Sequence, residues 1–195
     1  MNIGRPVEFD PDRALESAMH LFWKKGYEST SLQDLIQAMN LSKSSFYQAF
    51  GSKHQLFLRS IKLYRDSVVD EMYRLLGKAG SGRKFIEESL LSIANETRGV
   101  DARRGCLVMN SANEFSQRDP VIADLIKKST ESFSAILEKA VVAAQENNEI
   151  APNKDPKVLA QYLLTTMSGL KTMVKAGTSA NTIRAIANFA LKTLK

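Results

Sequence analysis

The stretch LSKSSFYQAFGSKHQLF, residues 41–57, contains two helix starts, at Ser42 and at Ser52. Serine is a favoured N-cap residue, and the glycine just before the second start is a typical helix stop. The segment between the two caps has room for barely two turns of helix. Phe46 and Phe50 are four residues apart, so they share one face and are expected to be buried. The exposed face of this short helix is then left with polar side chains alone.

The composition of the chain excludes several classes of protein. With 195 residues and 44% hydrophobic content, the chain is long enough for one large core or two small ones. No apolar run approaches the roughly 18 residues that a membrane span needs, so we expect a cytoplasmic protein without a membrane partner. A single cysteine excludes an internal disulfide, and with only two histidines no zinc-ligand spacing exists. We therefore expect neither a metal nor a cofactor.

The net charge of +6 permits an anionic partner but does not establish one. Residues 1–65 hold nine Lys/Arg against six Asp/Glu, a net of +3, and the remaining residues hold 18 against 15, also +3. Because the charge is shared between both parts of the chain, an argument for nucleic-acid binding has to rest on the positions of individual residues.

The sequence predicts an all-α fold, because apolar residues recur at spacings of three and four and β-branched runs are scarce. Asp10 before Pro11 is typical of a helix start, and Gly26 is expected to end that first helix. The second helix is expected to start at Thr30 or Ser31, and Thr30 with Gln33 resembles a capping box. Further helices are expected from Ser42, from Ser52 to about Leu76, and at about 83–98, 104–115, 119–147, 156–176 and 179–194, which makes nine in all.

The second and third predicted helices, joined by a short turn, form a helix-turn-helix pattern. In that motif the second helix enters the major groove of DNA and the first supports it. Lysine, serine and glutamine can bind base edges, while a tyrosine hydroxyl and the start of the following helix suit phosphate. The alternative is an ordinary helical hairpin with a solvated outer face, as in a helical interaction protein that does not bind DNA. The candidate DNA-binding residues are Arg5, Thr30, Ser42, Lys43, Ser44, Ser45, Tyr47, Gln48 and Lys53.

Residues 4–57 resemble the N-terminal domain of TetR-like (TetR/AcrR) bacterial transcriptional regulators. The similarity lies in FWKKGYEST, in TSLQDL and in the stretch quoted above; Asn40 and Ser44 depart from glycines that are common in the family. The resemblance implies a DNA-binding domain (1–55), a larger helical effector-binding and dimerisation domain (56–195), and a homodimer on a near-palindromic double-stranded operator. It implies a repressor, not an enzyme, that an unidentified small-molecule effector releases from DNA. It also implies phosphate contacts from the positions of Thr30, Tyr47 and Lys53.

The second domain contains two sets of apolar candidates, and for each the alternative is simple core packing. Methionine and aromatic residues suit an adaptable ligand pocket, and apolar stripes on the last two helices suit pairing with a second copy. The candidate pocket residues are Met109, Phe115, Phe133, Tyr162 and Met167. The candidate dimer residues are Leu163, Leu170, Ile183, Ala187 and Ala190.

Cys106 follows two arginines and a glycine in RRGCLVMNSANEF, residues 103–115, near an expected helix start. Cations and a helix N-terminus favour the reactive thiolate. The segment is similar to one in a branch of the family whose cysteine senses oxidants or electrophiles, with a lysine of the penultimate helix nearby. That resemblance favours Lys175 as the partner, with Lys171 second. The alternative is a small, buried, inert residue. An enzyme with Cys106 as nucleophile lacks support, because both histidines are distant in sequence.

Overall fold

The computed structural model describes residues 9–99, 102–115 and 117–194. These residues form nine α-helices and one 3₁₀ helix and contain no strand, which confirms the predicted all-α fold. The elements are α1 (Pro11–Lys25), α2 (Leu32–Ala38), α3 (Lys43–Phe50), α4 (Lys53–Lys78), α5 (Gly82–Ser92), η1 (Ile93–Thr97), α6 (Leu107–Phe115), α7 (Pro120–Glu146), α8 (Pro156–Lys175) and α9 (Ala180–Lys192).

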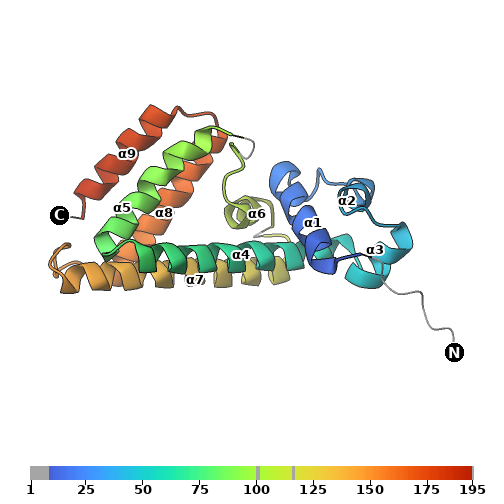
Figure 1. The fold of residues 1–195 in the computed structure, drawn as a ribbon, viewed down its shortest axis with the longest axis horizontal. Coiled ribbons are helices and arrows are strands. Elements are labelled where there is room, and N and C mark those ends of the chain that lie inside the picture. Colours follow the sequence, from blue (N-terminus) through green and yellow to red (C-terminus); the bar gives the residue numbers. More distant parts are fainter. Residues whose placement is uncertain (1–8, 100–101, 116, 195) are drawn as a thin grey trace.

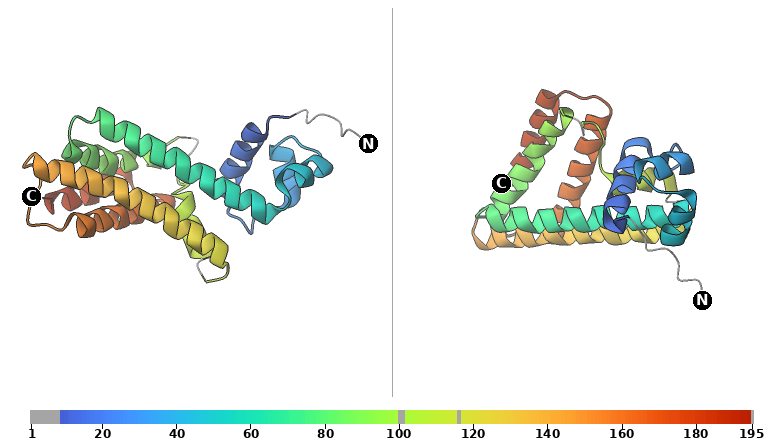
Figure 2. Two further views of the ribbon diagram at one scale, coloured as in Figure 1. Left: turned by 90° about the horizontal axis from the view of Figure 1, so that it is seen from below. Right: turned by 45° about the vertical axis from the view of Figure 1, so that its right-hand side comes forward.

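The two longest helices, α4 and α7, run side by side along the molecule and form its base (Figures 1 and 2). We call α1–α3 the head; it packs around the N-terminal part of α4. We call α5–α9 with η1 the body; α5, α8 and α9 gather at the opposite end of the long pair, and the short α6 lies between that group and the head (Figure 1). Since α4 runs without a break from the head into the body, the division at residues 55 and 56 stays a prediction.

Local capping chemistry explains most of the helix boundaries. The Asp10 carboxylate accepts hydrogen bonds from the backbone N–H groups of Asp12 and Arg13, and Gly26 follows the last residue of α1, as predicted. Aspartate also precedes proline at the starts of α7 and α8 and caps both helices.

One predicted capping box and two predicted boundaries were wrong. The capping box of α2 is formed by Ser31 and Asp34, not by Thr30 and Gln33, because the Thr30 hydroxyl donates to the Gly26 carbonyl inside the head. The helix expected at 83–98 stops at Ser92 and continues as η1, and α6 begins at Leu107 instead of residue 104.

Two hydrophobic cores hold these helices together. One lies in the body, between α5, η1, α7, α8 and α9. The other contains the head residues Phe22, Leu35 and Phe46 and continues into the body through Leu107 of α6 and Ile122 of α7. The head therefore shares its core with the helices that connect it to the body.

The close packing of α5 on α7 leads to a stability prediction. A Cβ atom at Gly82 would lie 1.9 Å from the backbone oxygen of Ala140. Displacing a backbone atom of a packed helix costs energy. We therefore expect Gly82→Ala to lower the free energy of unfolding by about 1–3 kcal/mol. Gly77 is the matched control, since it lies in the last turn of α4 with nothing within 4 Å of an added Cβ. Gly77→Ala should raise stability slightly through helix propensity. Chemical denaturation measures both; equal effects of the two substitutions would contradict this account.

Candidate nucleic-acid interface and effector cavity

The orientation of α3 is fixed by its two phenylalanines. Phe46 and Phe50 are buried in the head core, where their rings lie near each other. The opposite face of α3 is consequently turned to solvent, and the Tyr47 side chain is 47% exposed. The polar residues on or beside this outer face are Ser42, Lys43, Ser44 and Gln48, all exposed, and Ser45, which is partly exposed.

Two of the serines take part in the capping of α3, with Ser42 as the N-cap and Ser45 as its partner. The Ser42 hydroxyl accepts a hydrogen bond from the Ser45 backbone N–H at 3.1 Å, and the two hydroxyl oxygens are 2.9 Å apart. Lys43, Ser44 and Gln48 therefore carry the polar groups of α3 that are most available to a partner.

The first helix of the motif, α2, is held by its capping box and by an ion pair to α1. The Asp34 carboxylate accepts from the Ser31 backbone N–H at 2.9 Å, and the Lys25 ammonium lies 3.0 Å from it. The backbone hydrogen bond from Ser31, followed by the hydrogen bond from Lys25, lowers the pKa of Asp34 to about 2. Asp34 is thus charged at neutral pH and links the end of α1 to the start of α2.

The start of α4 lies beside the motif. The Ser52 hydroxyl caps α4 by accepting from the Gln55 backbone N–H, and the Lys53 ammonium lies 4.1 Å from the centroid of the Tyr27 ring. Thr30 does not match its predicted role, because its side chain is completely buried and its hydroxyl is already bonded inside the head. Arg5 lies outside the described residues.

Contacts that sequence analysis missed attach the head and the start of α4 to α6 and its flanks. The Glu114 carboxylate accepts backbone N–H groups of the α1–α2 loop, from Glu28 at 2.9 Å and from Tyr27 at 3.4 Å. His54 Nε2 lies 2.7 Å from a carboxylate oxygen of Asp119, whose pKa is lowered by the backbone N–H of Ile122 and by His54. No motif or periodicity indicates these pairs, because their members are far apart in sequence.

A second link joins the Trp23 indole of α1 to the segment that precedes α6. The Trp23 Nε1–H donates to the Gly105 carbonyl at 3.1 Å, and the Arg104 guanidinium lies 5.4 Å from the Trp23 ring centroid. Arg104 also lies 3.2 Å from His20 Nδ1. The chain immediately before Cys106 is therefore fixed to the head.

An inner cavity of about 90 Å³ lies between α4, α6, α7 and α8. It brings together four of the residues proposed from the sequence, Cys106, Met109, Phe133 and Met167. Sequence analysis missed Tyr64, Met72 and Leu164, which complete much of the wall together with Lys171, its second choice as the partner of Cys106. They lie on α4 and α8, and their inward direction becomes evident only when the two helices are packed.

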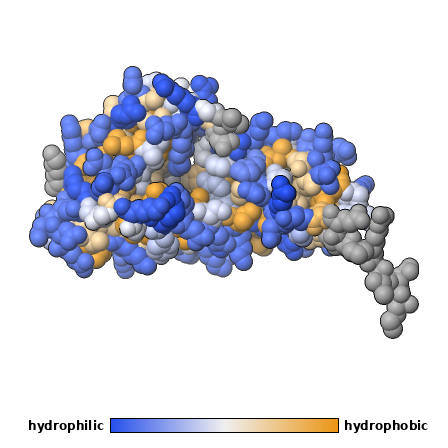
Figure 3. All heavy atoms as spheres, in the orientation of Figure 1, coloured by the Kyte–Doolittle hydropathy of each residue, from blue (hydrophilic) through white to orange (hydrophobic). Residues whose placement is uncertain are grey.

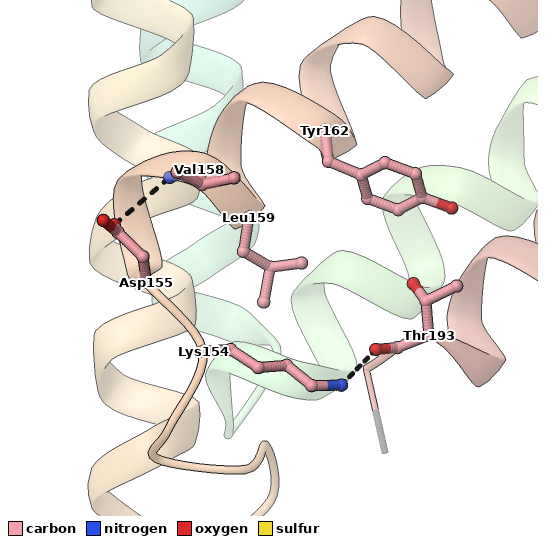
Figure 4. A pocket seen from close by; sticks show the side chains of 6 residues that line it. All are labelled: Lys154, Asp155, Val158, Leu159, Tyr162 and Thr193. Atoms are coloured by element: carbon pink, nitrogen blue, oxygen red, sulfur yellow. Dashed lines mark hydrogen bonds between the residues drawn. The ribbon is translucent and has the colours of Figure 1, made fainter.

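Two predicted pocket residues lie elsewhere. Phe115 packs against the rings of Tyr27 and Phe57 in the head core, so it is a structural residue. Tyr162 lines a separate surface hollow between the start of α8 and the end of α9, together with Val158 and Thr193 (Figure 4).

Cys106 is partly buried and stands one residue before α6. The Tyr64 phenol is within hydrogen-bond reach of the thiol; burial, and then Cys106, raise the pKa of Tyr64 well above its ordinary value. Lys171, the second choice from the sequence, lines the cavity with Cys106 and forms an ion pair with Glu96. The preferred Lys175 is exposed and does not line the cavity. Lys171 shares the cavity with the thiol, whereas a Cβ at Gly105 would lie 3.5 Å from Lys175 Cδ, so the choice between the two lysines stays a prediction.

The predicted dimer residues lie on the faces of α8 and α9 that point into their own chain. Leu163, Leu170, Ile183, Ala187 and Ala190 are all buried in the body core of a single chain, so they cannot contact a second copy. The exposed large apolar residues of the same two helices are Val158, Tyr162 and Met173 on α8 and Ile186 and Phe189 on α9. The molecular face drawn in Figure 3 is largely hydrophilic, with separate apolar patches over the head and the body.

Comparison with known proteins places this architecture in a family. The model of bacterial regulatory proteins of the tetR family matches residues 14–59, and that of the tetracyclin repressor-like C-terminal domain matches residues 84–189. The chain belongs to the TetR family, whose members are transcriptional regulators and not enzymes. The predicted helix-turn-helix and the class of protein are thereby confirmed.

Relatives and solved structures match over nearly the whole chain. The transcriptional repressor ComR of Escherichia coli K12 is 30% identical over 190 residues, which cover 97% of this chain and 90% of ComR. The uncharacterised regulator YezE of Bacillus subtilis 168 is 28% identical and covers 89% of this chain and 90% of its own length. The regulator CifR, solved as a cysteine mutant bound to a 26-base-pair operator, is 28% identical with a TM-score of 0.87 and covers 98% of this chain and 100% of its own.

None of the helices in the described part of the chain is both long and apolar enough to cross a membrane.

Proposed function

We propose that this protein is a transcriptional repressor that binds a near-palindromic DNA operator as a homodimer in the cytoplasm, and that a small-molecule effector in the body releases it. The observation that carries the proposal is the exposed polar face of α3, which two buried phenylalanines hold outward. ComR is named as a repressor, and CifR is solved on its operator, which agree with this function.

In the proposed complex, α3 lies in the major groove. Lys43, Ser44 and Gln48 contact base edges, because lysine pairs with guanine and glutamine with adenine. Tyr47 and Lys53 contact phosphate beside the groove, and the N-terminus of α4 adds backbone N–H groups. Ser42 acts mainly as the cap that fixes the start of α3, with Ser45 as its hydrogen-bond partner.

Release of DNA depends on the spacing of the two heads in the dimer. Two recognition helices fit successive major grooves when they are about 34–36 Å apart. Suppose that an effector binds the inner cavity more tightly when the two heads are at a different separation. It then shifts the dimers away from the arrangement that fits DNA. The contacts of Glu114 and Trp23 supply the physical link between the cavity helices and the head.

The dimer face consists of the exposed apolar residues of α8 and α9. Val158 and Tyr162 are four residues apart on α8, and Ile186 and Phe189 are three apart on α9, so each pair shares one face of its helix. An exposed apolar surface on two neighbouring helices suits an isologous contact in which each copy supplies the same residues.

Modification of Cys106 by an oxidant or electrophile is a second candidate trigger. The thiol lines the inner cavity beside Tyr64 and immediately precedes α6, so an added group would press on the helix that holds the head. The crystallised forms of the related regulator CifR carry cysteine substitutions.

Base contacts and phosphate contacts can be separated by mutation. Tyr47→Phe should weaken binding to all DNA sequences alike, whereas Lys43→Ala should cost about 1–3 kcal/mol and also relax the choice of one base pair. Fluorescence anisotropy with DNA from upstream of the protein's own gene, across a salt series, measures both. The exposed Lys157 on α8 serves as the control, and Lys157→Ala should bind as the wild type does. If both substitutions weakened binding to all DNA sequences equally, the proposed base contact of Lys43 would be refuted.

The proposed dimer face is tested by placing a charge in it. The Phe189 side chain is 69% exposed in the single chain, so Phe189→Glu should leave the monomer folded but prevent its association. Sedimentation equilibrium should then show a monomer at concentrations where the wild type is a dimer, and operator affinity should fall. The matched control is Val121→Glu at the start of α7, where the side chain is 57% exposed; this variant should remain a dimer. A Phe189→Glu protein that remains dimeric would overturn the assignment.

A further inference from the structure

Two cavities meet at the Lys171 side chain. The inner cavity of about 90 Å³ lies on one side, and an outer hollow of about 420 Å³ opens between the head and the body on the other. Trp23 of α1, Arg98 after η1 and Lys171 of α8 all line the outer hollow, whereas Lys171 also lines the inner cavity. The lysine thus occupies the boundary between the outer hollow and the inner cavity.

The described lining of the outer hollow is positively charged. Arg98, Arg104 and Lys171 contribute three cations, and Glu96 is the one carboxylate among the described lining residues. A hollow with this balance favours an anionic ligand, and carboxylate groups form strong charge-assisted hydrogen bonds with both arginine and lysine.

The ion pair between Lys171 and Glu96 can be exchanged. Its side chains are 25% and 35% exposed, so water reaches both partners. A ligand carboxylate that replaced Glu96 at Lys171 would keep the lysine paired, and Glu96 would turn towards water. The exchange therefore leaves neither charge buried without a partner or water.

The inner cavity suits an apolar group. Its wall contains Met72, Met109 and Met167 with the Phe133 ring and Leu137. Methionine side chains are flexible and adapt to the shape of a guest, so this small space can enlarge around a hydrocarbon. A charged group inside it would lose its hydration, so the charge of a ligand belongs at the Lys171 rim.

We propose that the effector is a small amphipathic organic acid, held by its carboxylate at Lys171 and Arg98 and by its apolar part in the inner cavity. This inference rests on the proposed function and specifies the chemistry of its ligand. Such a ligand would lie against the segment that Trp23 holds through the Gly105 carbonyl, and would contact α6 at Met109. Its binding would therefore act on both parts of the body that contact the head, the segment at Gly105 and helix α6.

The single tryptophan of the chain provides the measurement, because Trp23 lines the outer hollow. Sodium hexanoate is titrated into the full-length protein while the tryptophan emission is followed, with hexanol as the neutral counterpart and sodium chloride as the salt control. We expect a saturable change with hexanoate and a much weaker response to hexanol. Identical curves for the acid and the alcohol, or no saturable response to the acid, would overturn the proposal.

Variants locate the binding. Lys171→Gln and Arg98→Gln should each weaken hexanoate binding about tenfold, the scale of one charge-assisted contact. Lys157→Gln, on the same helix as Lys171 but in neither lining, should bind as the wild type does. Arg98 is exposed, so its substitution tests the site without risk to the fold. If both variants bound hexanoate with wild-type affinity, the placement of the carboxylate at Lys171 and Arg98 would be refuted. Operator binding without hexanoate is measured separately, so a failure of the repressor assignment is distinguishable from a failure of the ligand assignment.

Discussion

The Glu114 carboxylate at the end of α6 accepts two backbone N–H groups of the loop between α1 and α2. Hydrogen bonds to a charged acceptor are stronger than neutral ones, so this contact fixes the loop from which the helix-turn-helix continues. The same short helix places Met109 in the wall of the inner cavity. One element of nine residues therefore touches both the ligand space and the head.

The shared hydrophobic core makes this connection stiff. Phe22 and Phe46 of the head belong to the same buried cluster as Leu107 and Phe115 of α6. Packed interiors resist continuous deformation, so a shift of α6 is expected to move the head as a unit. The His54–Asp119 pair ties the start of α4 to the start of α7, so the helix that follows α3 is held as well. Recognition and regulation thus depend on the same packing.

The sequence could predict features set by local chemistry. Asp10 before Pro11 and Ser42 before a short apolar pattern define their helices through backbone capping, which nearby residues decide. The outward face of α3 followed from the spacing of Phe46 and Phe50 alone. Family resemblance extended this reading from a polar helix to a DNA-binding protein.

Features set by tertiary packing could not be predicted in the same way. Periodicity identified the apolar stripe of α9 through Ile183 and Ala187, but it could not tell whether that stripe faces its own chain or a second copy. Phe115 and Met109 lie on the same short helix, yet one packs into the head core and the other lines the cavity. Thr30 has the side chain of a cap, but the adjacent Ser31 takes that role because Thr30 is turned into the head.

The most direct test of this account is the operator affinity of Glu114→Ala, measured by fluorescence anisotropy beside Glu87→Ala, an exposed substitution on α5. Loss of two hydrogen bonds to a charged acceptor frees the α1–α2 loop, so we predict binding at least about tenfold weaker than that of the wild type. The control should bind normally, and circular dichroism should show that both proteins keep their helices. Unchanged operator affinity in a folded Glu114→Ala protein would contradict the claim that α6 holds the head in its DNA-binding position.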